Sequence, residues 1–260
     1  VEKNLRTPYV MTYSLNLQQE LFGHGVLQVG YVGSGGRSLL RYRDINQPNA
    51  TAIRAYDYAT NGCCVPRPFD SAAIMSPLAP NAPFYVNQLE TSANSTYNSL
   101  QASFQQRAWR GLTNQVAYTW SHSIDNASDG QDYVPNAAQP NDSQSTRGDR
   151  GNSNFDVRHR FVWSLTYAFP KWEAAKRFGE GWSISSVVTL MSGHPFHVNY
   201  NFLGDYDGSG GFFGRPDVAG AVRYNRSNPR QFLDLSAFKV PCTLANGDFD
   251  EPPDGIVDTN

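Results

Sequence analysis

The sequence predicts an all-β protein, an antiparallel up-and-down section of a transmembrane β-barrel with about six to eight long strands. Three observations predict this fold class. Several segments alternate between apolar and polar residues, the period of a strand whose two faces meet different surroundings. Each segment runs for about ten to fifteen residues, enough for a tilted strand to cross a bilayer. The connections between the segments are alternately short and very long, as in outer-membrane barrels.

The composition agrees with this fold class and excludes two others. The chain of 260 residues contains 22 Gly, 16 Pro, 14 Tyr and 15 Phe, which combines turn-forming residues with aromatic residues that favour strands. Its net charge of −2 gives no general attraction for nucleic acid, so we expect no nucleic-acid partner. The sequence also lacks the run of about 18 apolar residues that a transmembrane helix needs.

The fullest alternation lies at residues 155–169. Odd positions from Phe155 to Phe169 are apolar or aromatic apart from His159, and the even positions are small or polar apart from Val162. The same period recurs elsewhere, and we expect the final strand to continue beyond its Gly193-His194-Pro195 interruption. The predicted strands cover residues 8–22, 25–33, 98–108, 112–122, 155–169 and 181–201.

The predicted connections fall into two classes of length. Phe22-Gly23-His24-Gly25 and Trp109-Arg110-Gly111 form short turns, and residues 171–181 form a moderate link. Residues 34–97 and 123–154 form long loops, which a compact soluble domain rarely accommodates. We therefore expect the short turns to be periplasmic and the long loops extracellular.

Aromatic residues fall near both predicted membrane surfaces, as the interfacial girdles of barrels require. The periplasmic end would carry Phe22, Trp109, Trp172, Phe178 and Trp182, and the outer end Tyr9, Tyr31, Trp120 and Phe161. A soluble β-sandwich that binds carbohydrate is the less favoured alternative. Sandwich strands also alternate, but they are usually nearer five or six residues long, and their loops need not alternate in length.

The strand segments resemble the Oar-like TonB-dependent outer-membrane receptors, a family with a carboxypeptidase-regulatory-like domain. The fullest match is Phe155-Asp156-Val157-Arg158-His159-Arg160-Phe161. Each match is weak alone, but together they occur in the expected order over most of the chain. The other matching stretches are residues 8–10, 15–21, 29–34, 97–101, 116–125, 181–182, 192–196, 215–217, 232–234 and 237–238.

The resemblance implies a barrel of about twenty-two strands with a plug inside it. On this reading residues 1–260 are a partial barrel domain in the bacterial outer membrane, and Val1 begins an internal section of a longer precursor. The implied function is uptake of a scarce nutrient, a siderophore, glycan or peptide. The implied partners are outer-membrane lipid and a TonB-type energising protein, which would contact the part of the protein before Val1. An outer-membrane adhesin or structural barrel is the alternative.

One group of residues could suggest an enzyme. Ser121, His122 and Asp125 lie close together in the sequence and contain the three residue types of a hydrolase triad. They fall at the end of a predicted strand, with no nucleophile elbow or oxyanion device beside them. We therefore expect no catalytic residues, no cofactor and no enzyme activity.

Three arginines fall on the polar face of the predicted strands, which would line the barrel interior. These residues are Arg107, Arg158 and Arg160. They could guide an anionic solute through the barrel. We favour ion pairs, either with the plug or with a carboxylate of the wall such as Glu20 or Asp156.

Two acidic segments have partial features of a calcium site. Residues 205–210 place oxygen donors at alternate positions before a Gly, like the first half of a calcium loop. The twelfth position of such a loop would be Pro216, and Asp217 comes one residue late, so we favour a flexible turn. We interpret residues 246–258 as a solvated acidic loop and predict no metal site.

The three cysteines have no metal-binding spacing. Cys63 and Cys64 are adjacent, and a bridge between neighbours is strained. Either of them could bridge Cys242 in an oxidising compartment. We favour free thiols in loops.

Overall fold

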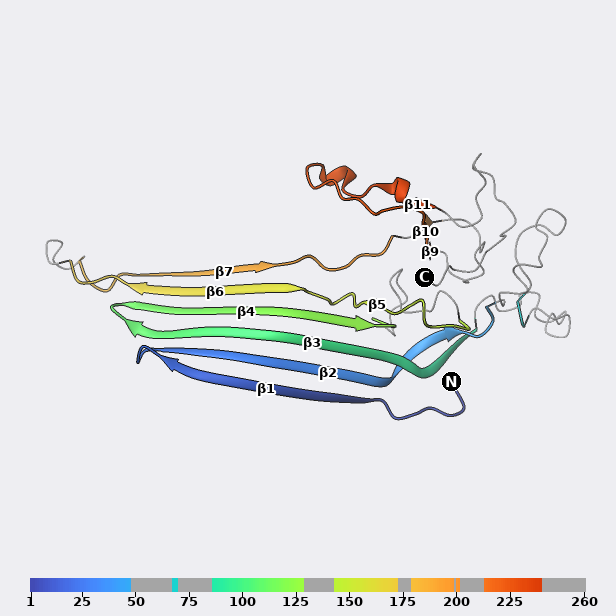
Figure 1. The fold of residues 1–260 in the computed structure, drawn as a ribbon, viewed down its shortest axis with the longest axis horizontal. Coiled ribbons are helices and arrows are strands. Elements are labelled where there is room, and N and C mark those ends of the chain that lie inside the picture. The colour runs from blue at the N-terminus through green and yellow to red at the C-terminus, as the bar shows by residue number, and fades with distance from the viewer. Residues whose placement is uncertain are drawn as a thin grey trace.

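Six long antiparallel strands make up one sheet in the computed structural model, which describes residues 1–47, 67–69, 86–128, 143–172, 179–198, 200–201 and 213–239. The strands are β1 (Tyr9–Leu21), β2 (Gly25–Asp44), β3 (Asn87–Trp109), β4 (Leu112–Asp125), β6 (His159–Ala168) and β7 (Ser183–Met191). Each pairs with its neighbours in the order β1-β2-β3-β4-β6-β7, and a short β5 (Gly151–Asn152) pairs with the end of β4. Figure 1 shows this up-and-down arrangement.

Smaller elements lie towards the end of the sheet that carries the long connections (Figure 1). They are the strand pairs β8 (Tyr200–Asn201) with β9 (Phe213–Gly214) and β10 (Asp217–Val218) with β11 (Phe238–Lys239), and the 3-10 helices η2 (Pro229–Gln231) and η3 (Leu235–Ala237). No helix in the described part of the chain is both long and apolar enough to cross a membrane.

The two predicted short turns occur at the opposite end of the sheet (Figure 1). Phe22 and Gly23 have φ values of 58° and 68°, and Arg110 and Gly111 have φ values of 50° and 83°. A Cβ on Gly111 would lie 2.4 Å from the carbonyl oxygen of Ala168. The β3–β4 turn therefore requires glycine both for its backbone conformation and for the close approach of the neighbouring strand.

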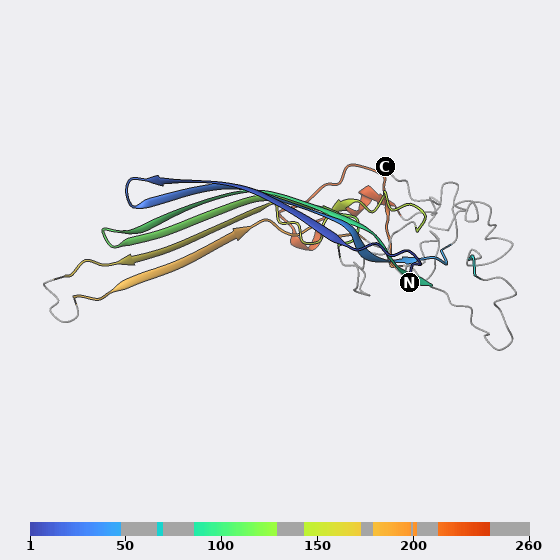
Figure 2. The ribbon, with the colours of Figure 1, turned by 90° about the horizontal axis from the view of Figure 1, so that it is seen from below.

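The sheet is curved along its length and remains open (Figure 2), with β1 and β7 as its edges in the described residues. The other sheets in this part of the chain have only two strands each. The only buried apolar residues described are Ala93 and Ala237, so the apolar face of the long strands has no second sheet packed on it. The soluble sandwich considered from the sequence is therefore wrong for the described residues.

Two strands are much longer than predicted. We expected a strand at residues 25–33 and a loop at 34–97, but β2 continues to Asp44 and β3 begins at Asn87. The added part of β2 is rich in Gly, Ser and Arg, without the alternation that marks the rest of the strand. Register shifts between Gly36 and Arg41 form a bulge there, and the hairpin changes direction at this end (Figure 1).

Two other strands are shorter than predicted. β6 begins at His159 instead of residue 155, because the preceding residues turn and the carboxylate of Asp156 accepts the backbone N–H of Ser123 at 2.7 Å. β7 ends at Met191, so the predicted continuation to residue 201 is wrong. Pro195 has no N–H to extend the ladder. The predictions for residues 8–22 and 112–122 agree closely with β1 and β4.

Candidate functional site

The strand register brings the predicted apolar faces together on one side of the sheet. Paired positions across the six strands form a continuous row of Leu17, Val29, Ala102, Tyr118, Phe161 and Leu190. The adjacent row on the other side of the sheet consists of Gln18, Gln28, Ser103, Ala117, Val162 and Thr189. Each strand therefore contributes to one apolar and one largely polar surface, as its alternation predicts.

The apolar side is not covered by protein. Leu17 is 69% exposed, Leu190 is 61% exposed and Trp120 is 54% exposed. A continuous apolar surface of this extent marks a contact with another phase or partner. The 10 residues of β6 extend about 33 Å and, at a tilt of about 40°, reach about 25 Å across a membrane. This height matches the hydrocarbon-facing band of a β-barrel.

Polar side chains on the apolar side are paired with aromatic ones. Near the outer end, the hydroxyls of Tyr13 and Tyr31 donate to Asn98 Oδ1 at 3.2 Å and 2.7 Å. Towards the short turns, Trp163 Nε1 donates to Asn114 Oδ1 at 2.7 Å. An unpaired polar group is costly in lipid, so these contacts let Asn98 and Asn114 occupy the surface. Amphipathic rings are also favoured near both membrane surfaces.

The structure tests two of the three arginines that we assigned to the barrel interior. Arg160 lies in β6 on the polar side, opposite Thr119 and Met191. Arg158 precedes the strand, and its Nε lies 3.0 Å from Asp156 Oδ2. The predicted ion pair with a wall carboxylate is thus confirmed for Arg158. Arg107 lies in β3, and its backbone N–H donates to the His24 carbonyl at 2.8 Å.

The hydrolase-like group does not assemble. Ser121 Oγ donates to the carbonyl oxygen of Val157 at 2.7 Å, and His122 Nε2 lies 2.9 Å from Asn152 Oδ1. Successive residues of β4 point to opposite faces, so His122 lies across the sheet from Ser121 and Asp125. The serine, imidazole and carboxylate therefore have separate structural partners.

The sequence did not predict a cluster of charged residues at the outer end of β2 and β3. Arg41 and Asp149 are 0% and 4% exposed at their side chains, so their charges are withdrawn from solvent. Asp44 also accepts the backbone N–H groups of Asn46 and Val86 at 2.9 Å and 3.0 Å. The ion pairs of this outer cluster include Arg41–Asp149 at 3.2 Å, Arg67–Asp44 at 3.2 Å and Arg43–Glu90 at 2.6 Å.

Asp149 ties the outer cluster to a more distant segment. Its two carboxylate oxygens lie 3.2 Å from Arg41 and 3.1 Å from Arg215. The alternation of Arg41 and Arg43 is visible in the sequence, but their partners are 108 and 47 residues away. The spacing of residues in the sequence therefore does not predict these ion pairs. The Asp149 carboxylate nevertheless links three parts of the chain.

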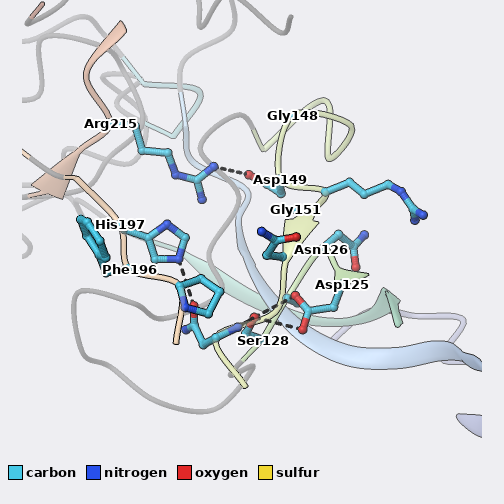
Figure 3. Close-up of a pocket in the computed structure, with 14 residues that line it drawn as sticks. Asp125, Asn126, Ser128, Gly148, Asp149, Gly151, Phe196, His197 and Arg215 are labelled. Atoms are coloured by element: carbon cyan, nitrogen blue, oxygen red, sulfur yellow. Dashed lines mark hydrogen bonds and ion pairs between the residues drawn. The ribbon is translucent and has the colours of Figure 1, made fainter. Parts of the chain in front are cut away.

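Beside the outer cluster lies a pocket of about 330 Å³. It is formed by the end of β4 and the residues after it, residues 148–152, Asn154, residues 195–197 and Arg215. Figure 3 shows His197 and Arg215 on one side of the pocket, with Asp125 and Ser128 on the other. From the sequence, Asp125 was considered only as a member of a hydrolase-like group, and no pocket was predicted.

Hydrogen bonds hold the pocket wall in place. Ser128 Oγ donates to the two carboxylate oxygens of Asp125 at 2.8 Å and 3.0 Å, and it accepts the Asn154 N–H at 2.9 Å. His197 Nε2 lies 3.0 Å from Asn154 Oδ1 (Figure 3). Desolvation by the surrounding chain and the positive charge of Arg215 lower the pKa of His197, against the opposing effect of Asp125. The imidazole is therefore mainly neutral at pH 7.

Several predicted features lie outside the described residues. They are Cys63, Cys64, Cys242, Phe178, the calcium-like residues 205–210 and the acidic stretch 246–258. The free cysteine thiols that we favour and the nature of both acidic segments therefore stay predictions.

Comparison with known protein families gives one match. A family model described as an outer membrane beta barrel domain matches residues 1–257. Among curated proteins no match is found, and no solved structure matches either. The family match covers the long-stranded sheet and the outer end alike, and it agrees with the two-faced surface that the strand register builds.

Proposed function

The chain belongs to the outer membrane beta barrel domain family, and we propose that it forms part of the wall of a TonB-dependent receptor that takes up a scarce nutrient. Its location is the bacterial outer membrane, where the apolar side of the sheet contacts lipid. The proposed partner that supplies energy is a TonB-type protein, acting through a part of the receptor outside this chain. The assignment to a TonB-dependent receptor rests on the polar side of the sheet, which would line the barrel interior.

The polar side of the sheet carries the proposal. From β1 to β4 most positions on this side carry uncharged polar residues, whereas Arg160 of β6 lies opposite Thr119. The uncharged residues include Asn16, Gln18, Gln28, Gln101, Gln105, Gln115 and Thr119. Such a surface suits a wide lumen that holds water or a polar plug, whereas small barrels are filled by their own side chains.

The outer end supports a receptor more than a simple pore. Residues 38–44 of β2 extend about 23 Å past the last residue of β2 that pairs with β1, together with the first part of β3. The outer cluster holds connecting segments against this extension through buried ion pairs. An ordered structure above the membrane gives a nutrient a defined surface to bind before it enters the barrel.

Conductance of the full-length protein in planar lipid bilayers tests the proposal. We expect a closed barrel, and a large, steady conductance once the plug is deleted, because the wide polar lumen is then open. A TonB box and a plug should also be encoded upstream of Val1. An adhesin built on a small barrel would conduct in neither form, and a precursor without a plug would contradict the receptor proposal.

A further inference from the structure

The pocket beside the outer cluster has balanced charges. Its charged lining residues are Asp125, Asp149, Arg150 and Arg215, two of each sign. Asp149 is already paired with Arg215 and with Arg41 behind it. A ligand with a strong charge of either sign would therefore meet one like charge for each opposite charge. The balance favours a neutral ligand.

One asparagine presents an amide donor in this pocket. The Oδ1 atom of Asn126 accepts the backbone N–H of Asn94 at 2.7 Å. Because a backbone N–H can only donate, this contact fixes which end of the amide is the oxygen. No partner among the described residues takes the amide nitrogen, so Asn126 retains donors for a ligand. Asn152 also lines the pocket, but it pairs with Ile124 and its Oδ1 lies 2.9 Å from His122 Nε2, on the opposite face of β4 from Asp125.

The lining of the same pocket also includes an acceptor, Asp125. Both carboxylate oxygens of Asp125 accept from the same hydroxyl group of Ser128. A carboxylate has about four lone-pair sites, so this contact leaves Asp125 with capacity for further donors. The pocket thus offers donors and an acceptor within one small space of about 330 Å³, at the lower end of the size range of small-molecule sites.

We propose that this pocket binds a neutral sugar unit of an extracellular glycan, whose hydroxyl groups accept from Asn126 and donate to Asp125. A hydroxyl group both donates and accepts, so a ring with several hydroxyls matches this mixture. The polar lining differs from the mainly apolar walls that most small-molecule pockets have. The inference rests on the proposed function, since it names the substrate class of that receptor.

Binding of the full-length protein in detergent to an array of neutral oligosaccharides, uronate-containing oligosaccharides and short peptides tests the inference. In Asn126→Asp, the new carboxylate still accepts the internal hydrogen bond but no longer donates to a ligand. We expect this variant to weaken binding to neutral oligosaccharides by roughly tenfold or more. Asn225→Asp is the matched control, because Asn225 Oδ1 accepts the Ser227 N–H at 3.1 Å outside the pocket.

The outcomes separate this inference from the receptor proposal. Failure of the wild-type protein to bind any neutral oligosaccharide, preference for peptides or uronates, or unchanged binding by Asn126→Asp would overturn it. Limited proteolysis of the outer loops checks that this variant keeps its fold. If neutral oligosaccharides bind and Asn126→Asp loses them, while bilayer recordings show no plugged pore, the glycan site stands and the receptor proposal fails.

Discussion

The membrane-crossing sheet and the outer cluster follow opposite rules of burial. In the sheet, large apolar residues such as Leu15 and Leu17 are 66% and 69% exposed. In the outer cluster, the charged residues Arg41, Asp44 and Glu90 are buried at 0%, 2% and 5% exposure. A soluble domain would show the reverse, with apolar residues inside and charges outside.

This contrast shows what stabilises each region. The sheet has continuous backbone ladders, and lipid takes the place of a protein core on its apolar side. The outer cluster depends on specific ion pairs between segments far apart in the sequence. A substitution that unfolds one region should therefore leave the other region folded.

Asp149→Asn should have the largest effect, and it should be confined to the outer end. The change removes the carboxylate that lies 3.2 Å from the fully buried guanidinium of Arg41. Removing one partner of a buried ion pair costs about 3–5 kcal/mol. We expect much faster proteolysis of the outer loops on intact cells, with normal insertion of the barrel measured by heat-shifted gel mobility.

Glu180→Gln is the control for Asp149→Asn. It removes a carboxylate from the Lys171–Glu180 pair, whose side chains are 61% and 58% exposed. Exposed pairs contribute about 0–1 kcal/mol, so this variant should resemble the wild type. Equal sensitivity of the two variants to protease would contradict the separate role of the buried outer cluster.

Leu165→Arg should damage the sheet instead. Leu165 and Ser164 are neighbours in β6 and lie on opposite faces, with Ser164 paired to Gln115 and Val187 on the polar side. Arginine facing lipid costs about 2–4 kcal/mol near the middle of the membrane. We expect Leu165→Arg to lower the yield of heat-modifiable barrel, while Ser164→Arg inserts nearly as well as the wild type. Equal insertion of both variants would mean that the assigned faces are wrong.

How far the sequence predicts the fold follows from the same contrast. β1 was predicted almost to the residue because lipid and lumen impose different residues on its two faces. The extension of β2 beyond Gly33 was missed because its faces no longer differ in a regular way, and from Ser38 onward it runs past the last pair with β1. Alternation of apolar and polar residues therefore predicts which part of a strand contacts the membrane better than it predicts where the strand ends.

The candidate site was predictable only where its contacts are local. The Arg158–Asp156 pair spans two residues and was anticipated. Arg41 and Asp149 are separated by 108 residues, and neither the β2 extension nor the segment around residue 149 was expected to be ordered. Asp125 was noticed for its sequence neighbours, whereas its role in the pocket depends on a fold of the connection that no local pattern encodes.

Gly111→Ala should have a moderate effect on the sheet. Gly111 has φ +83°, and its new Cβ would meet a backbone oxygen of the neighbouring strand. A left-handed conformation costs an L-residue about 1–2 kcal/mol, and the contact adds to that cost. Gly23→Ala shares the positive φ, but nothing lies within 4 Å of its Cβ. Urea unfolding of the refolded barrel should therefore give Gly111→Ala a lower free energy of unfolding than Gly23→Ala. The opposite order would contradict the close approach of the neighbouring strand to the β3–β4 turn.

Titration of His197 should give the smallest effect, and it concerns the outer end alone. Its pKa is lowered from 6.5 by desolvation and then by Arg215, so the folded protein binds the proton less readily than the unfolded chain. Protonation of His197 therefore lowers the free energy of unfolding as the pH falls through 6.5 and below. NMR of the histidine ring should show Arg215→Gln raising the pKa of His197 and Asp125→Asn lowering it further. A lowered pKa of His197 in Arg215→Gln would show that Arg215 does not face the imidazole. That result would contradict the position of Arg215 and His197 on the same side of the pocket in Figure 3.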